Sequence, residues 1–480
     1  MTITPLLPNS NQPLYEQVAQ RIQGAIEDGT LTDGDRLPSV RKLRHQLSVS
    51  VSTVLEAYRL LEDRGLIVAR PQSGYYVKST GQRLPEPRPS RPPQRSSPVD
   101  ISLALQMMDS VRDRHLPQLG AAVPNPEHLP VAALNRIMGK VLRAESIDTH
   151  SYGTFSGCHL LQQEVAKRML NAGCSVPPDQ VTITNGATEA VYLSLRAVTQ
   201  PGQVVAIESP TYFGMLEMLK SLNLRALELP THPRDGISLR ALEEAIATQH
   251  IAACLLIPNF NNPIGSCMTD EAKKALVELL DRYDVPLVED DIYGELQFEG
   301  DRPKAAKAFD TEGRVLYCSS VSKTLSPGLR VGWSIAGRYQ AQIHQLKLVV
   351  SQMSATAPQL TVANFFASGG CDRHLRKLRR LNQSQMIRMQ QAIQAYFPTD
   401  IRVTQPTGGH VLWLEMPRWF DSLALYREAL QHDISIAPGI MFSASSRYRQ
   451  CFRLNAALSW SPELDQALAT IGHLAAQQGP

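Results

Sequence analysis

The sequence predicts three parts: a winged helix-turn-helix unit at residues 1–79, a linker at 80–98, and a large α/β domain with a mainly parallel sheet at 99–480. Three observations support this organisation. Helical apolar stripes precede two short β-favouring runs near the N-terminus, a proline-rich stretch follows them, and strand-like runs then alternate with helical ones. Such alternation is typical of a sheet wrapped by helices.

The N-terminal unit is predicted from three helices and a wing. The first helix carries apolar residues at helical spacing, namely Leu14, Val18, Ile22 and Ile26. A second helix opens after Ser39, and a third begins near Ser50. Residues 66–69 and 75–77 favour β-structure and are joined by a segment with proline and glycine, which suits a hairpin turn.

The linker prediction depends on composition. Residues 80–98 are rich in proline and arginine and show no apolar periodicity. Such chains favour the extended polyproline conformation, at about 3 Å per residue. The segment is therefore long enough to separate the N-terminal unit from the large domain, or to place it over a neighbouring subunit.

The large domain is predicted from apolar runs separated by helical patterns. The strands that we expect lie at 181–184, 204–207, 252–257, 286–289, 315–318 and 332–336. Ligands of such sheets bind at the carboxyl ends of the strands. The residues that follow each run are therefore the candidates for a functional site.

Composition excludes several classes of protein. The chain has 48 basic and 45 acidic residues, so any contact with nucleic acid must come from a local patch. Its seven cysteines are scattered without Cys-x-x-Cys spacing, which favours reduced thiols over disulfides or a metal site. No apolar run reaches the roughly 18 residues that cross a bilayer, and no signal-peptide pattern begins the chain. We therefore expect a cytoplasmic protein that has no membrane partner.

The segment at 319–330 carries the clearest chemistry. Lys323 lies between hydroxyl residues, follows a predicted buried strand, and precedes Arg330 by seven positions. A phosphorylated aldehyde requires an amine for a Schiff base, and hydroxyls and a guanidinium for its phosphate. Lys323 is therefore the candidate anchor for pyridoxal phosphate. A solvated lysine on a loop is the alternative.

Polar or aromatic residues follow three other predicted strands. Gly186, Ala187 and Thr188 form a turn into a helix, where N–H groups and a hydroxyl suit a phosphate. Tyr212 is placed to stack on a pyridine ring, and an ordinary core tyrosine is the alternative. The amide of Asn262 suits a phenolate oxygen, and a solvent-facing turn asparagine is the alternative.

Two further strand-associated segments carry charged residues. Asp290 ends a predicted strand, where a buried carboxylate would keep a pyridine nitrogen protonated, and Tyr293 is placed to reach the 3′ oxygen. A capping carboxylate is the alternative for Asp290. Arg453 lies on a predicted strand between apolar neighbours, where an unpaired guanidinium is costly. A substrate α-carboxylate is its natural partner, and an internal salt bridge is the alternative.

The N-terminal unit resembles the GntR family of bacterial regulators. The motifs that carry the resemblance are Pro13-Leu14-Tyr15, Gly34-Asp35-Arg36-Leu37-Pro38-Ser39-x-Arg41, Ser52-Thr53-Val54-x-x-Ala57-Tyr58 and Ser73-Gly74-Tyr75-Tyr76-Val77. It implies that the third helix enters the major groove of double-stranded DNA and that the wing contacts the DNA backbone. The residues that it implies face DNA are Arg36, Arg41, Ser50, Ser52, Thr53, Arg70 and Gly74. Many relatives carry arginine where this chain has Val51, which shifts base reading toward Arg41; use of the unit for protein contact alone is the alternative.

Across residues 100–475, the strand-end residues resemble fold type I pyridoxal-phosphate aminotransferases in order and spacing. The resemblance implies that Lys323 forms the internal aldimine, that Asp290 pairs with the ring nitrogen, and that Arg453 binds the substrate carboxylate. It also implies that Tyr152 reaches the phosphate of the partner subunit, so that a homodimer completes the site. The other implied contacts are phosphate binding by Gly186, Ala187, Thr188, Ser320, Ser322 and Arg330, stacking by Tyr212, and hydrogen bonds to the 3′ oxygen from Asn262 and Tyr293. Asn261 and Ile264 depart from the relatives and leave Asn262 in register.

A GntR-like unit joined to an aminotransferase-like domain resembles the MocR branch of GntR regulators. This resemblance implies a bacterial transcription factor that lies in the nucleoid when bound to DNA. We expect an amino compound, or pyridoxal phosphate itself, to be sensed through the internal aldimine at Lys323. Exchange to an external aldimine would then change the spacing of two DNA-reading units. An active aminotransferase, with Lys323 as its base, is the alternative, since every residue that it needs is present.

Overall fold

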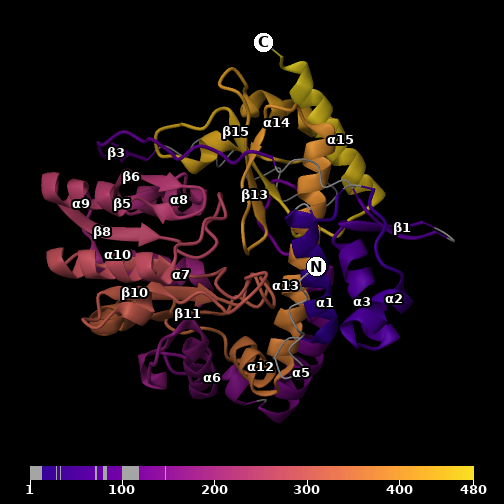
Figure 1. The fold of residues 1–480 in the computed structure, drawn as a ribbon. Helices are drawn as coiled ribbons and strands as arrows, with labels where there is room; N and C mark the ends of the chain where they lie inside the picture. Colours follow the sequence, from indigo (N-terminus) through magenta and orange to yellow (C-terminus); the bar gives the residue numbers. More distant parts are fainter. Residues whose placement is uncertain are drawn as a thin grey trace.

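The computed structural model describes residues 13–28, 30–32, 34–70, 73–78, 84–99, 118–145 and 147–479. We call residues 13–78 the head, residues 84–98 the described linker, and residues 118–479 the body. Residues 71 and 72, at the predicted turn of the wing, lie outside the described residues. Figure 1 shows the head packed against one side of the body.

The head has the predicted three helices and wing. Its elements are α1 (Leu14–Glu27), α2 (Val40–Leu47), α3 (Val51–Asp63), β1 (Ile67–Arg70) and β2 (Gly74–Val77). The side chains of Ser39 and Ser50 accept hydrogen bonds from backbone N–H groups in the first turns of α2 and α3, which fixes where both helices begin. Tyr58 of α3 is fully buried and donates a hydrogen bond to the Pro38 carbonyl, so it joins α3 to the start of α2. The predicted fold of this unit is confirmed.

A nine-stranded sheet forms the centre of the body in the described part of the chain, with β3, β6, β5, β8, β9, β10, β11 and β4 in order and β7 paired to β6. Its strands are β3 (Ser97–Pro98), β4 (Thr182–Thr184), β5 (Val204–Ser209), β6 (Arg225–His232), β7 (Gly236–Ile237), β8 (Ile251–Leu256), β9 (Leu287–Asp290), β10 (Val315–Ser320) and β11 (Gly332–Ile335). The run from β6 to β10 is parallel, whereas β11 is antiparallel to both of its neighbours. The predicted mainly parallel sheet is confirmed.

Helices cover both faces of the sheet because successive strand residues are apolar and point to opposite sides. In β8, Leu255 packs with α7 (Ala187–Val198) and α8 (Phe213–Ser221), while its neighbours Cys254 and Leu256 pack with α9 (Leu239–Thr248) and α10 (Asp270–Tyr283). The other described α-helices between residues 118 and 369 are α5 (Val131–Ala144), α6 (His159–Met169), α11 (Gln340–Val350) and α12 (Thr356–Ala367). Because helices cover both faces of the sheet, a ligand can reach the parallel strands at their carboxyl ends.

A smaller unit follows at the C-terminus. Its four-stranded antiparallel sheet contains β12 (Arg402–Val403), β13 (Val411–Glu415), β15 (Cys451–Asn455) and β14 (Ala437–Pro438) in this order. The helices α14 (Ser422–Leu430) and α15 (Pro462–Gln477) cover it, and α13 (Gly370–Tyr396) connects it to the large sheet. Within the described residues, no helix is both long and apolar enough to cross a membrane.

The described linker lies along the body and does not extend away from it. Ser90 exchanges hydrogen bonds with Thr231 on β6, and the Arg88 N–H donates to the Glu415 carboxylate. Ser97 and Pro98 form β3 at the edge of the large sheet. The head accordingly packs on its own body, although the sequence had suggested that an extended segment could separate them.

The helix α13 lies beside the head (Figure 1), and its polar side chains hold the head in this position. Arg380 donates to the Tyr15 hydroxyl at 2.7 Å and pairs with Glu16 at 3.3 Å, both on α1. Ser384 and Arg388 donate to the Asp63 carbonyl at the end of α3, at 2.7 Å and 3.0 Å. The contact between head and body is therefore largely a set of hydrogen bonds.

Candidate cofactor and ligand site

A cavity of about 330 Å³ opens at the carboxyl ends of the parallel strands. Most of the site residues predicted from the sequence meet there, although they are far apart along the chain. Those that line the cavity are Ala187, Thr188, Tyr212, Asn262, Asp290, Tyr293, Ser322, Lys323, Arg330 and Arg453. The cavity thus combines three cations, one carboxylate and several hydrogen-bonding groups.

One end of the cavity suits an anion. Gly186 has a φ of 86° and precedes the first turn of α7, of which Ala187 and Thr188 line the cavity; N–H groups at a helix start of this kind suit an anion. The Arg330 guanidinium lies against this turn and donates to the Asn185 carbonyl at 2.8 Å. A Cβ on Gly186 would collide with the Arg330 guanidinium, so only glycine permits this approach. Ser320 lies just behind, where its Oγ accepts the Ser322 N–H at 3.2 Å.

Lys323 and Asp290 lie deeper in the cavity. The Lys323 amine donates to the Ala122 carbonyl at 2.6 Å, and burial together with nearby Arg453 lowers the pKa of Lys323 to about 8. Burial raises the pKa of Asp290 to about 7, and one of its oxygens accepts the Ile292 N–H. An amine with a depressed pKa reacts readily with an aldehyde, and a buried carboxylate of this kind favours a cationic partner.

Three side chains could hold an aromatic ring between these groups. Tyr212 precedes α8, and a Cβ on Gly214 would come within 2.5 Å of its ring, so the small residue lets the tyrosine lie over the helix start. Asn262 is buried, and its Nδ2 donates to the Tyr293 hydroxyl at 3.4 Å. The anion-binding turn, the amine, the carboxylate and these three side chains together fit pyridoxal phosphate.

Arg453 is the unusual group of the site because its guanidinium is buried, with 1% exposure. It donates to the side-chain oxygen Oδ1 of Asn262 at 2.8 Å and to the backbone carbonyl of Gly120, while its Nε has no hydrogen-bond partner. Its guanidinium lies 5.0 Å from the centre of the Phe442 ring, and burial lowers the pKa of Arg453 to about 10. No described carboxylate forms an ion pair with it, so the internal salt bridge that the sequence left open is not observed among these residues.

Tyr152 lies away from this cavity. Its side chain is 87% exposed, in the loop that precedes α6, and it does not approach the phosphate end of its own chain. The contact of Tyr152 with the phosphate of a partner subunit stays a prediction.

The structure adds a histidine that sequence reasoning missed. His410 is buried directly before β13, and its ring packs edge-on against Tyr293 with 5.4 Å between ring centres. Burial, and after it the charge of Lys323, lowers the pKa of His410 to about 3, so the imidazole is neutral. In the sequence, His410 follows Gly408 and Gly409 and directly precedes an apolar run, and this position was the signal that could have identified it as a site residue.

A backbone segment over the cavity was also missed. The carbonyls of Gly120 and Ala122 accept the hydrogen bonds of Arg453 and Lys323, and Asn455 of β15 binds the same segment at the carbonyls of Leu119 and Val123. We call residues 119–123 the strap. It has little periodicity, and so its position depends on contacts distant in sequence.

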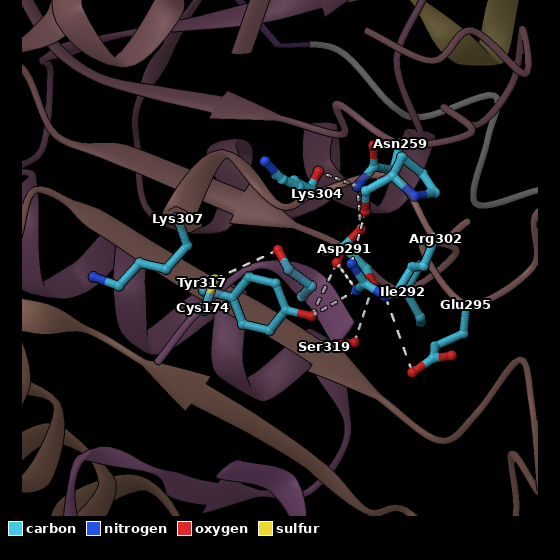
Figure 2. A network of polar contacts seen from close by, with 12 residues as sticks. Cys174, Asn259, Asp291, Ile292, Glu295, Arg302, Lys304, Lys307, Tyr317 and Ser319 are labelled. Carbon is cyan, nitrogen blue, oxygen red and sulfur yellow. Dashed lines mark hydrogen bonds and ion pairs between the residues drawn. The ribbon is translucent and has the colours of Figure 1, made fainter. Parts of the chain in front are cut away.

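A buried polar network surrounds Asp291 (Figure 2), the residue directly after Asp290 at the end of β9. Asp291 pairs with Arg302, and it accepts hydrogen bonds from the Tyr317 hydroxyl and the Asn259 amide, both at 2.9 Å. Its backbone carbonyl accepts the Ser319 hydroxyl at 3.0 Å. The network joins the ends of β8, β9 and β10, which holds the site residues of these strands in register.

The predicted DNA-facing residues lie on the head. Arg36, Arg41, Ser50, Ser52, Arg70 and Gly74 are exposed and Thr53 is half-buried. Ser50 Oγ lies 2.7 Å from Ser52 Oγ and 2.8 Å from Thr53 Oγ1, so these hydroxyls cluster at the N-terminus of α3. The Arg70 guanidinium stacks 4.4 Å from the centre of the Tyr76 ring on the wing. Packing of the head on α13 leaves this face open.

Comparisons with known proteins define the class. The family model "Aminotransferase class I and II" matches residues 123–471, and the model "Bacterial regulatory proteins, gntR family" matches residues 14–77. LysN, the α-aminoadipate aminotransferase of Thermus thermophilus, solved in complex with N-(5′-phosphopyridoxyl)-L-leucine, has 26% sequence identity and a TM-score of 0.73 over 79% of this chain and 96% of its own. The body is thus a class I and II aminotransferase domain, of the kind that uses pyridoxal phosphate.

Two relatives share the complete two-part organisation. The uncharacterized HTH-type transcriptional regulators YjiR and YdcR of Escherichia coli strain K12 are 38% and 39% identical to this chain. The matches cover 95% and 96% of this chain, respectively, and 98% of each relative. The chain therefore belongs to the MocR-type GntR regulators, which join a DNA-binding helix-turn-helix unit to an aminotransferase domain.

Proposed function

We propose that this transcriptional regulator senses an amino compound, with pyridoxal phosphate attached at Lys323. The observation that carries the proposal is the buried Arg453 guanidinium, which faces the same cavity as Lys323 and lacks an ionic partner among the described residues. A buried cation of this kind is costly unless an anion joins it. The α-carboxylate of an amino acid supplies that anion and brings an amine toward Lys323.

The cofactor supplies an aldehyde that bonds reversibly to amines. The protein supplies everything else. Arg330 and the turn before α7 would hold the phosphate, Asp290 would hold a protonated ring nitrogen, and Lys323 would provide the attachment point. Tyr212, Asn262 and Tyr293 orient the ring. Sensing therefore amounts to a competition between two amines in a site with a fixed carboxylate anchor.

Contacts from the site to the head support a regulatory role. Glu295 lies in the loop that carries Asp290 and Tyr293, and Arg379 of α13 donates both to its carbonyl at 2.7 Å and to its carboxylate at 3.1 Å. The next residue, Arg380, binds α1 of the head. A ligand that moves this loop therefore acts on α13 at the place where the head is held. Such a ligand can change the balance between a head docked on α13 and a displaced head only by the difference between its affinities for these two arrangements.

A homodimer is the second part of the proposal. Exposed apolar side chains occur in the loop before α6 and on α11, namely Tyr152, Phe155, Leu348, Val349 and Val350. Phe155 packs against His344 of α11, which brings these two segments together. Large exposed apolar residues in neighbouring segments favour a protein contact. Tyr152 of one subunit would then reach the phosphate end of its partner's cavity, and the ligand would change the spacing of two heads.

An active aminotransferase is the second candidate function. The observation that favours it is the complete set of groups around Lys323, whose pKa of about 8 suits an amine that moves a proton. Sensing of pyridoxal phosphate alone is a narrower form of the regulatory proposal. It predicts that Arg453→Ala leaves the effect of the cofactor on DNA binding intact.

One experiment separates these functions. The full-length protein, loaded with pyridoxal phosphate, is given a DNA duplex that it selected from a random-sequence pool. Amino acids are then added while cofactor absorbance, DNA affinity and release of 2-oxo acid are followed. A change in absorbance together with DNA affinity, without stoichiometric 2-oxo acid, is the expected result. Rapid release of 2-oxo acid with unchanged DNA affinity would establish the enzyme and refute the sensor.

A further inference from the structure

Apart from Arg453 and the residues assigned to the cofactor, the described lining of the cavity is apolar. Its walls come from the start of α8, from the segment of β14 and the 3₁₀ turn at Gly439–Phe442, and from the strap and α7. The side chains that form these walls are Phe213, Met215, Met218, Ile436, Met441, Val123 and Val191. Three of the seven are methionines, whose unbranched side chains adapt to apolar groups of different shape.

The charged groups of the cavity all have a role in the proposed function. Among the described lining residues, the cations are Lys323, Arg330 and Arg453, and the one carboxylate is Asp290. Lys323 and Arg330 serve the cofactor's aldehyde and phosphate, Asp290 its ring nitrogen, and Arg453 the α-carboxylate. The apolar walls therefore offer no charged partner to a ligand side chain.

The strap contributes carbonyl oxygens to the cavity. Gly120 packs so tightly that a Cβ would come within 2.7 Å of the backbone of Ile436, the residue directly before β14, so the strap lies against this segment. The carbonyls of Gly120 and Ala122 point to Arg453 and Lys323. Oxygen atoms at this position repel a second carboxylate and compete with it for Arg453.

We infer that the ligand sensed at this site is an α-amino acid with a single carboxylate and an uncharged, apolar side chain. The inference rests on the proposed function, because it takes Arg453 as the carboxylate anchor. A side-chain carboxylate or ammonium would be desolvated against the methionines and Ile436 without a partner, and burial of an unpaired charge is strongly unfavourable. Leucine and methionine have the required chemistry, whereas glutamate and lysine do not.

Binding to the intact protein tests the inference. The full-length protein with pyridoxal phosphate is titrated by calorimetry and by cofactor absorbance with L-leucine, L-methionine, L-glutamate and L-lysine. We expect leucine and methionine to bind at least about tenfold more tightly than glutamate and lysine, since an unpaired buried charge costs more than the 1.4 kcal/mol that corresponds to tenfold. Equal or tighter binding of glutamate or lysine overturns the inference and means that a charged group from elsewhere, such as the partner subunit, enters the pocket.

A charge placed in the wall sharpens the test. Met218 is half-buried on α8, so Met218→Lys adds an ammonium at the cavity with little cost to packing. We expect this variant to bind glutamate more tightly than the wild type by about tenfold or more, and leucine more weakly. Leu170→Lys, at an exposed position away from the cavity, adds the same charge and is expected to leave both affinities unchanged. If both variants gained the same affinity for glutamate, the overall charge of the protein, and not the apolar wall, would set the preference for leucine over glutamate.

The readouts separate this inference from the proposed function. If leucine binds selectively but DNA affinity does not change, the selectivity stands and the sensor fails. If glutamate or lysine binds best and changes DNA affinity, the sensor stands and the assignment of an apolar ligand fails.

Discussion

Replacement of Arg453 by methionine should cost the unliganded protein almost no stability. Burial lowers the pKa of Arg453 from 12.5 to about 10, which corresponds to about 3 kcal/mol against the charged form. Removing the guanidinium relieves this cost but loses its hydrogen bonds to Asn262 and Gly120, at about 1.5 kcal/mol each. The two effects nearly cancel, so we expect the free energy of unfolding of Arg453→Met to lie within about 1 kcal/mol of the wild type.

The same substitution should strongly weaken binding of the amino acid through its carboxylate. Charge-assisted hydrogen bonds contribute about 1.5–3 kcal/mol each, so we expect the affinity for L-leucine to fall by at least about tenfold. Urea denaturation of the cofactor-loaded protein, with and without L-leucine, measures both effects in one set of experiments. The ligand should stabilise the wild type and leave Arg453→Met unchanged.

Arg302→Met provides the contrasting control. Arg302 is buried in an ion pair with Asp291, and loss of one partner of such a pair costs about 3–5 kcal/mol. We therefore expect a large loss of stability from this variant. If Arg453→Met were destabilised as strongly as Arg302→Met, Arg453 would be a structural residue and the reasoning that gives it an external anion would be refuted.

Three further predictions concern other parts of the molecule. The pKa of His410 falls from 6.5 in the unfolded chain to about 3 in the folded protein. As the pH drops below 6.5, His410 therefore binds a proton in the unfolded chain but not in the folded protein, and the free energy of unfolding decreases. The difference between wild type and His410→Phe in urea denaturation should therefore shift by about 2 kcal/mol in favour of the variant between pH 7 and pH 5, and an unchanged difference would contradict the burial argument. Arg41→Ala should weaken binding of the selected duplex by about 1–3 kcal/mol in fluorescence anisotropy, whereas Lys274→Ala, exposed on the body, should not. Glu295→Gln should keep the affinity for L-leucine but bring the ratio of DNA affinities with and without leucine toward one; an undiminished ratio would show that coupling does not pass through this carboxylate.

Much of the site could be predicted because its chemistry is local in sequence. Lys323 lies among hydroxyl residues after a buried strand, and Asp290 ends another, so each is recognisable from a few neighbours. The parallel sheet then brings such strand ends together without further specification. Arg453 was recognisable for a different reason, since a charged residue between apolar neighbours on a strand must find a partner.

The missed elements depend on contacts that no local pattern encodes. Strand β6 contains Arg225, Glu228 and Pro230, and it forms through parallel pairing with β5, while the buried Glu228 accepts hydrogen bonds from the hydroxyls of Ser209 and Ser445. Such a sequence has a poor intrinsic preference for a strand, and tertiary contacts override it. The strap is similar, since its carbonyls are fixed by Arg453, Lys323 and Asn455 from three distant parts of the chain.

The docking of the head was hidden for a related reason, and its chemistry bears on regulation. Arg380, Ser384, Arg388 and Gln391 recur on one face of α13 at helical spacing, which in the sequence resembles an ordinary solvated face. Polar contacts of this kind exchange readily with water, so each adds little net stability. An interface within one chain that is mainly polar permits domains to separate. The head is therefore held in part by polar contacts of Arg380, which directly follows Arg379, the residue that binds Glu295.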